Sequence, residues 1–149
     1  MELSKAKNFQ LKNTDGKQFD LYEYQDDSLI LLVFFRGEWC KDCREQLTEL
    51  NANYLWFKKK NIKIVAVSSD DQLFTSILRE IIKSKFPILS DHSWKIFELY
   101  GFKRPTDEKR IKPALFLFNA KHQILYKHIG KSKKDRPSIK SLKKLCDNN

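Results

Sequence analysis

The sequence predicts an α/β fold in which helices cover both faces of a central mixed sheet. Continuous apolar runs of strand length alternate with stretches of helical periodicity, and this alternation is typical of a largely parallel sheet with helices packed against it. The 149 residues are enough for one domain with a real core. Because no repeat or linker divides the chain, we expect a single domain over residues 1–149.

Each expected element has its own signal. Two short alternating runs around Asp15-Gly16 predict an N-terminal β-hairpin. Asp70-Asp71 is suited to cap a helix, Gly101 to end one, and Pro137 to open the last. The last two strands form an antiparallel hairpin at the edge. The order after the first hairpin is strand 28–35, helix 41–59, strand 61–69, helix 70–84, strand 86–91, helix 93–101, strand 113–118, strand 122–130 and helix 137–146.

The chain is strongly basic, with 29 basic and 19 acidic side chains and a net charge of +10. The charge is densest over residues 131–144. No groove-reading motif accompanies it, so we interpret this run as a solvated face and expect no specific nucleic-acid partner. No stretch approaches the roughly 20 consecutive apolar residues that span a bilayer, and we expect no membrane insertion. The first 17 residues contain no apolar leader segment, which predicts a cytoplasmic location.

Two cysteines lie where the first long strand turns into a helix, in the segment FFRGEWCKDCREQL over residues 34–47. A helix N-terminus carries partial positive charge and unpaired N–H groups, which lower the pKa of a thiol placed there. Cys43 begins an apolar stripe with Leu47 and Leu50 and is expected to face the sheet. Cys40 is expected at the cap, within reach of solvent. We therefore expect a redox-active pair in which Cys40 attacks and Cys43 resolves.

Charged neighbours are expected to tune this pair. Lys41 and Arg44 favour the thiolate, and Asp42 opposes it. Arg36, just before the turn, adds positive field.

A structural zinc site and an inert pair of buried thiols are the alternatives for the two cysteines. A lone C-x-x-C is half a zinc site, and the other candidate ligands, His92, His122, His128 and Cys146, are scattered along the chain. We therefore expect no metal and no other cofactor. Cys146 falls on the apolar side of the last expected helix and is predicted to pack in the core.

The chain also resembles a known group of proteins. WCKDC between a strand and a helix resembles the W-C-x-x-C active site of thioredoxin-fold proteins. FPILSDHSWKIFELYGF over residues 86–102 resembles a pattern of the alkyl hydroperoxide reductase/thiol-specific antioxidant (AhpC/TSA) group, which includes the peroxiredoxins. FFRGEWCKDC looks most like a peroxiredoxin-like branch of that group. The resemblance covers residues 9–145 and implies a thioredoxin-like fold with an N-terminal β-hairpin.

Further site residues are implied by the resemblance alone. Pro113 takes the place of the cis-proline that faces the disulfide in thioredoxin-like proteins, which implies a cis Lys112–Pro113 bond. The backbone of Lys112 would then pair with the substrate chain. Trp39 would shield the sulfurs and form a substrate platform with Pro113. A trans proline that opens a strand is the alternative.

The resulting functional hypothesis is a thiol–disulfide oxidoreductase that exchanges a Cys40–Cys43 disulfide with protein disulfides. Its electron partner would be another dithiol protein, of thioredoxin type, or glutathione. A thiol peroxidase that reduces hydroperoxides through a cysteine sulfenic acid is the alternative. The threonine and arginine that hold peroxide in peroxiredoxins are missing at their places, with Arg36 and Arg110 as candidates to replace the arginine. A non-catalytic binding module, whose thiols take no part in its function, is a third alternative.

Overall fold

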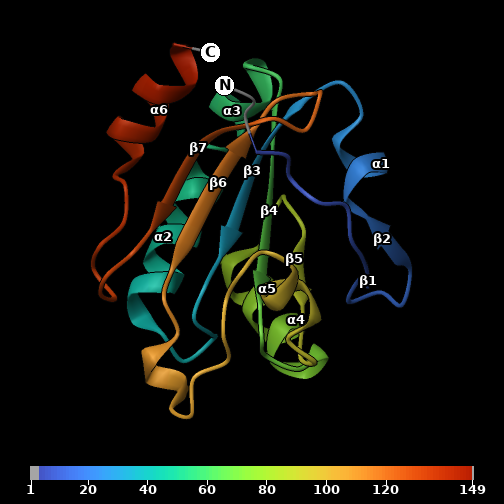
Figure 1. Ribbon diagram of the computed structural model, residues 1–149, viewed down its shortest axis with the longest axis vertical. Coiled ribbons are helices and arrows are strands. Elements are labelled where there is room, and N and C mark those ends of the chain that lie inside the picture. Colours follow the sequence, from blue (N-terminus) through green and yellow to red (C-terminus); the bar gives the residue numbers. More distant parts are fainter. Residues whose placement is uncertain (1–3, 149) are drawn as a thin grey trace.

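A five-stranded mixed sheet forms the centre of the protein (Figure 1), whose computed structural model describes residues 4–148. The strands lie in the order β5-β4-β3-β6-β7. Strands β3, β4 and β5 are parallel, whereas β6 and β7 are antiparallel to their neighbours. Their bounds are β3 Leu29–Phe34, β4 Ile62–Ser68, β5 Ile88–Ser90, β6 Ala114–Phe118 and β7 Ile124–Ile129. The predicted α/β fold with an antiparallel edge is confirmed.

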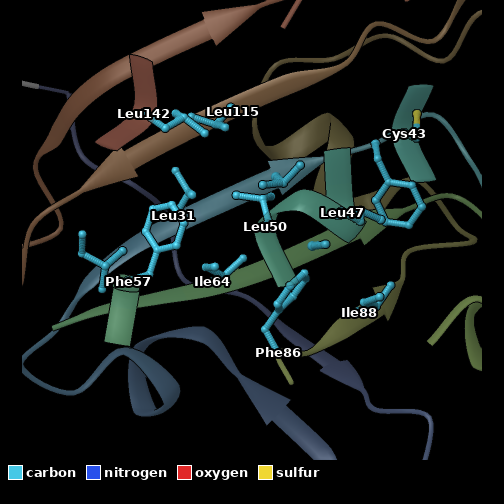
Figure 2. Close-up of a cluster of buried hydrophobic side chains, with 14 of the residues drawn as sticks. Leu31, Cys43, Leu47, Leu50, Phe57, Ile64, Phe86, Ile88, Leu115 and Leu142 are labelled. Carbon is cyan, nitrogen blue, oxygen red and sulfur yellow. The ribbon is translucent and has the colours of Figure 1, made fainter. Parts of the chain in front are cut away.

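Helices cover both faces of this sheet. The bounds are α1 Leu21–Gln25, α2 Lys41–Ala52, α3 Tyr54–Lys59, α4 Gln72–Ile82, α5 Lys95–Leu99 and α6 Ile139–Asp147. Side chains alternate along β3, so that Leu31 packs in one core with α2, α3, α4 and α6, whereas Leu32 packs in a second core with α1 and α5. Figure 2 shows the first core, in which Cys43, Leu47 and Leu50 of α2 lie along the sheet. The apolar stripe predicted for this helix is therefore correct.

The N-terminal hairpin is present as a separate two-stranded antiparallel sheet of β1 Gln10–Lys12 and β2 Gln18–Asp20. The expected second strand ends early, because α1 follows at once. Asp20 caps α1, and its carboxylate accepts the backbone N–H of Glu23 at 3.1 Å. The alternating pattern predicted a strand there, but the capping bond favours the helical turn.

Two helix boundaries also differ from the prediction. The helix expected over residues 41–59 is divided at Asn53, whose side chain donates to the carbonyl of Glu49 at 2.8 Å. A side-chain amide that binds a carbonyl of the last turn competes with the helical ladder and ends α2. The last helix begins at Ile139 with Ser138 as its cap, so Pro137 lies just before the cap instead of opening the helix.

No helix within residues 4–148 is long and apolar enough to cross a membrane. The same described residues contain no group of three or more His, Cys, Asp or Glu side chains arranged to hold a metal ion.

Cys146 packs in the first core beside Leu142 and is 5% exposed. Burial raises the pKa of its thiol to about 11, which makes it unreactive at neutral pH. We expect Cys146→Ser to lower the free energy of unfolding by about 1–2 kcal/mol, since it buries a hydroxyl in an apolar place. Urea denaturation measures this loss. The rate of thiol–disulfide exchange should not change, and a large fall in that rate would contradict a packing role.

Candidate active site

Cys40 is the N-cap residue of α2, six residues after β3 ends at Phe34. Its backbone is extended (φ −88°, ψ 110°), and its Sγ accepts the backbone N–H of Cys43 at 3.3 Å. The sulfur therefore occupies the position that a serine or aspartate oxygen fills in ordinary caps, where unpaired N–H groups and the helix dipole favour negative charge.

Cys43 lies one turn further on and is fully buried. Its Sγ accepts the backbone N–H of Arg36 at 3.3 Å, and its thiol hydrogen-bonds the sulfur of Cys40. Both cysteines are free, and they face each other within hydrogen-bond reach. The structure thus places the attacking and the resolving candidate as the sequence predicted, with one sulfur at the cap and the other beneath it.

The two thiols have opposite acidities. The hydrogen bond from Cys43 lowers the pKa of Cys40 to about 6, against the cost of burial, and the guanidinium groups of Arg36 and Arg136 add to the effect. Burial raises the pKa of Cys43, and the thiolate of Cys40 opposes a second negative charge beside it. At neutral pH the pair therefore holds one proton, which Cys43 donates to Cys40.

The predicted exposure of Cys40 is wrong, because only 3% of the residue is accessible. Arg36 places Nη1 3.7 Å from the Cys40 sulfur, and Arg136 places Nη2 3.8 Å from it. The sequence predicted a helix end open to solvent, but these long side chains fold over the sulfur. A substrate therefore reaches Cys40 only when a covering side chain moves.

Arg36 links the cysteines to a distant loop. Its other terminal guanidinium nitrogen donates to the backbone carbonyl of Lys109, in the loop before β6, and its Nε is buried without a hydrogen-bond partner among residues 4–148. The positive field predicted for Arg36 is present, since this charge lowers the pKa of Cys40. Arg110, the other candidate for a peroxide-binding arginine, lies exposed in the 3-10 turn Glu108–Arg110.

Arg136 is the site residue that sequence reasoning missed. Its Nη2 donates to the Cys43 sulfur at 3.1 Å, and its Nη1 donates to Oε1 of Gln46 at 2.7 Å. The basic run over residues 131–144 was interpreted as a solvated face, and nothing in its spacing singles out one cation. Arg136 lies 93 positions after Cys43 in the sequence, and only the tertiary fold brings it into contact with the sulfurs.

The segment that carries Arg136 is attached to the start of α2. Lys134 forms an ion pair with Asp42 at 3.1 Å, and its hydrogen bond lowers the pKa of this carboxyl. Asp42, expected to oppose the thiolate, is therefore paired with a cation. Lys41, expected to favour the thiolate, pairs instead with Glu45 at 3.9 Å, and Arg44 donates to the Glu38 carbonyl at 2.9 Å.

Trp39 directly precedes Cys40 in the sequence and has 38% of its surface exposed. The guanidinium of Arg36 lies 5.0 Å from its ring centre. A Cβ at Gly37 would lie 2.3 Å from the indole nitrogen, so this position accommodates only glycine beneath the ring. Trp39 also borders a cavity of about 430 Å³ lined by residues 106–109, on the loop that Arg36 binds.

The expected cis bond before Pro113 is wrong, because the Lys112–Pro113 bond is trans. Pro113 precedes β6, in which Ala114 pairs with Phe34, so it lies at the cysteine end of the sheet. Its carbonyl accepts the N–H of Gly130 at 2.8 Å, as a residue at the start of an edge hairpin does. Pro113 is buried and Lys112 is exposed. The alternative of a trans proline that opens a strand is therefore the correct one.

Gly130 is tightly packed against the segment that leads to Arg136 and against Pro113. A Cβ there would lie 2.6 Å from the carbonyl oxygen of Asp135 and 2.7 Å from Cγ of Pro113. We expect Gly130→Ala to displace the segment that carries Arg136, lowering the free energy of unfolding by about 1–3 kcal/mol and slowing thiol exchange. Urea denaturation and an exchange assay measure the two effects. Gly16→Asn is the control, since Gly16 has open space around it and asparagine tolerates its positive φ of 83° better than most side chains do. Equal behaviour of both variants would contradict the prediction.

The geometry can be compared with known proteins. The model of the AhpC/TSA family matches residues 3–127. The chain belongs to the AhpC/TSA family. This finding confirms the resemblance seen in the sequence, and among AhpC/TSA proteins both a disulfide oxidoreductase and a peroxide reductase are similar to this chain.

The first is a thiol-disulfide oxidoreductase ResA from Bacillus thuringiensis subsp. konkukian, 31% identical over 106 residues that cover 68% of this chain and 58% of that protein. The second is an alkyl hydroperoxide reductase C from Buchnera aphidicola subsp. Acyrthosiphon pisum, 33% identical over 127 residues that cover 77% and 64% of the two chains. The chain thus spans less than two-thirds of the length of either relative.

Solved structures establish the fold. Peroxidoxin BcpB from Mycobacterium tuberculosis superposes with a TM-score of 0.84 at 17% identity, over 98% of this chain and 94% of that one. A yeast mitochondrial 1-Cys peroxiredoxin gives 0.81 at 23% identity, over 99% and 75%. The AhpC/TSA chain therefore has the thioredoxin-like fold that its sequence predicted.

Proposed function

We propose that this AhpC/TSA protein, as one domain over residues 1–149, is a thiol–disulfide oxidoreductase that exchanges the Cys40–Cys43 pair with protein disulfides. The main support is the capping sulfur of Cys40, whose pKa is lowered to about 6 by the hydrogen bond from Cys43. A thiolate is thereby present at neutral pH, next to a second thiol that can close the exchange.

The reaction begins when the Cys40 thiolate attacks one sulfur of the substrate disulfide. An S–S bond forms between Cys40 and the substrate, and the other substrate sulfur leaves as a thiolate, which takes up a proton. Because Cys40 is 3% exposed, Arg36 or Arg136 moves aside at this step. The cavity beside Trp39, on the loop that Arg36 binds, offers space for the substrate chain.

The second step closes the pair. Cys43 loses its proton and attacks the Cys40 sulfur, the second substrate sulfur leaves, and a Cys40–Cys43 disulfide remains. Arg136 stabilises the negative charge on Cys43 while it is a thiolate, since its Nη2 lies 3.1 Å from the sulfur. The substrate gains two electrons, and a dithiol protein or glutathione returns two electrons to the pair. In the reverse direction the same steps oxidise a substrate dithiol. The cytoplasmic location stays a prediction.

Single-turnover oxidation of the reduced protein tests this function. We expect a protein disulfide, such as that of insulin, to oxidise the pair faster than hydrogen peroxide or cumene hydroperoxide does. Cys43→Ser should leave a mixed disulfide between Cys40 and the substrate, detectable by mass spectrometry, and Cys40→Ser should form none. Faster oxidation by peroxide than by the protein disulfide would contradict the proposal, whether Cys40→Ser or Cys43→Ser abolishes it.

A thiol peroxidase is the second candidate, because two guanidinium groups lie beside the low-pKa sulfur. Arg36 and Arg136 approach Cys40 at 3.7 and 3.8 Å, an arrangement suited to hold and polarise a hydroperoxide. The thiolate would attack the peroxide oxygen, release an alcohol or water, and become a sulfenic acid. Cys43 would then displace water from it and form the same disulfide. Single-turnover oxidation by a protein disulfide, compared with oxidation by a hydroperoxide, distinguishes the two candidates.

The third candidate is a binding module whose thiols take no part in its function. It predicts a different result for the double variant Cys40→Ser/Cys43→Ser. In that case partner binding and cellular function would persist without either sulfur, and raised salt would release the partner from the basic surface. Loss of function in the double variant, with the fold retained, would exclude this reading.

A further inference from the structure

A cavity of about 510 Å³ lies at the end of the sheet opposite the cysteines. Ile62, which lines it, pairs with Leu29 at the start of β3, whereas Phe34 pairs with Val67 at the cysteine end. At about 3.3 Å per residue these two ends are roughly 17 Å apart. In Figure 1, α3 lies at the upper end of the sheet, and the arrowhead of β3 points to the lower end. The cavity is therefore separate from the thiols.

The charged side chains that line this cavity are all cationic. They are Lys58, Lys63, Arg79 and Lys85, which come from α3, β4, α4 and the loop between α4 and β5. Among the described residues, none that lines the cavity carries a carboxylate, and none of the four cations forms an ion pair. The fold thus gathers four unneutralised charges around one hollow, which gives it a positive potential that attracts an anion of several charges.

Two of these cations are held in place by neutral groups. Lys63 donates to the carbonyl of Tyr24 at 2.7 Å and lies 5.3 Å from the centre of its ring. Arg79 donates to Oγ1 of Thr14 at 2.6 Å. Each contact uses one donor, and two donors of Lys63 and four of Arg79 are left for a ligand. Side chains ordered in this way lose little entropy when an anion binds.

The rest of the lining is apolar or uncharged. Tyr54 and Pro87 are partly exposed and supply carbon surface, and the exposed Asn61 supplies hydrogen-bonding groups. An inorganic anion would leave the carbon surface without contact, whereas an organic anion would cover it. The volume lies within the range of about 300–1,000 Å³ that is usual for small-molecule sites.

We propose that this cavity binds an organic phosphate of nucleotide size. The phosphate oxygens accept from the Arg79 fork and from Lys58, Lys63 and Lys85, since charge-assisted bonds of this kind are short and strong. The carbon part of the ligand lies against Tyr54 and Pro87. This binding does not involve the cysteines and goes beyond the proposed thiol chemistry.

Isothermal titration calorimetry of the 149-residue chain with ADP, inorganic phosphate and adenosine tests the proposal. At low salt we expect ADP to bind at least about tenfold more tightly than phosphate, and adenosine not to bind. Lys63→Gln/Arg79→Gln should weaken ADP binding at least about tenfold. Lys127→Gln/Lys140→Gln removes the same charge from exposed positions outside the cavity and should leave the affinity unchanged.

A second pair of substitutions guards against a folding defect in the first. Lys58 and Lys85 are exposed, so Lys58→Gln/Lys85→Gln should keep the fold and still weaken ADP binding several-fold. Cys40→Ser/Cys43→Ser should bind ADP like the unchanged chain, which separates this site from the thiol function. The proposal is overturned if ADP binds no better than phosphate, if its dissociation constant exceeds about 1 mM, or if the control pair weakens binding as much as the cavity pairs do.

Discussion

Iodoacetamide is expected to alkylate Cys40 at least about tenfold faster than Cys43 at pH 7. With the pKa of Cys40 lowered to about 6, about nine-tenths of this thiol is ionised at pH 7, whereas an ordinary thiol of pKa near 8.5 is only a few per cent ionised. The weaker nucleophilicity of a low-pKa thiolate offsets part of this gain. Burial raises the pKa of Cys43, so its thiolate is scarce.

The rate at which iodoacetamide alkylates Cys40 is expected to increase with pH. The rate should rise as the pH passes upward through about 6 and level off by about pH 7, because the reactive form is the deprotonated one. Peptide mass spectrometry after brief labelling identifies the modified cysteine. Cys43→Ala removes the hydrogen-bond donor to the Cys40 sulfur, so the half-maximal pH for alkylation of Cys40 should lie higher in this variant. Labelling of Cys43 before Cys40, or a half-maximal pH near 8.5 in the unchanged chain, would contradict the assigned roles.

The fold could be predicted from the sequence because its determinants are local. The apolar runs of β3 and β4 and the stripe of Cys43, Leu47 and Leu50 each indicate a buried strand or face without knowledge of the rest of the chain. The helical turn of α1 and the break at Asn53 were missed. In both, a single side-chain hydrogen bond to the backbone decides against the pattern of the longer segment.

The candidate site could be predicted only where sequence neighbours form it. Cys40 and Cys43 lie on one helical turn, so their spacing already implies a cap sulfur over a buried one. Part of the cover over Cys40 comes from elsewhere, since Arg36 lies four positions before the cysteine but Arg136 lies 96 positions after it. Arg136 and the Lys109 carbonyl reach the site through a strand hairpin and a loop, and no periodicity in the basic run distinguishes Arg136 from its solvated neighbours. The expected exposure of Cys40 was wrong for this reason.

Arg136 acts on the two sulfurs both through its charge and through a direct hydrogen bond, and different substitutions can separate these two effects. Its charge lowers the pKa of both sulfurs, and its Nη2 donates to the sulfur of Cys43 at 3.1 Å. Two further hydrogen bonds hold the Arg136 side chain in position. Its Nε donates to the Lys133 carbonyl at 2.7 Å, and its Nη1 donates to Gln46. A guanidinium held in this way stabilises Cys43 when it becomes a thiolate, either as it attacks Cys40 or as it leaves during reduction.

Arg136→Gln should therefore raise the half-maximal pH for alkylation of Cys40 by about one unit and slow closure of the Cys40–Cys43 disulfide about tenfold. Arg136→Lys keeps the charge without the planar fork and should restore the pH profile better than the closure rate. Lys133→Gln is the matched control, because this exposed lysine lies in the same segment and its side chain makes no contact with either sulfur among the described residues. Stopped-flow oxidation and the pH profile of labelling measure the two effects. If Lys133→Gln shifted the pH profile as far as Arg136→Gln, the effect would belong to the general positive charge of the segment, and the direct bond to Cys43 would have no special part in it.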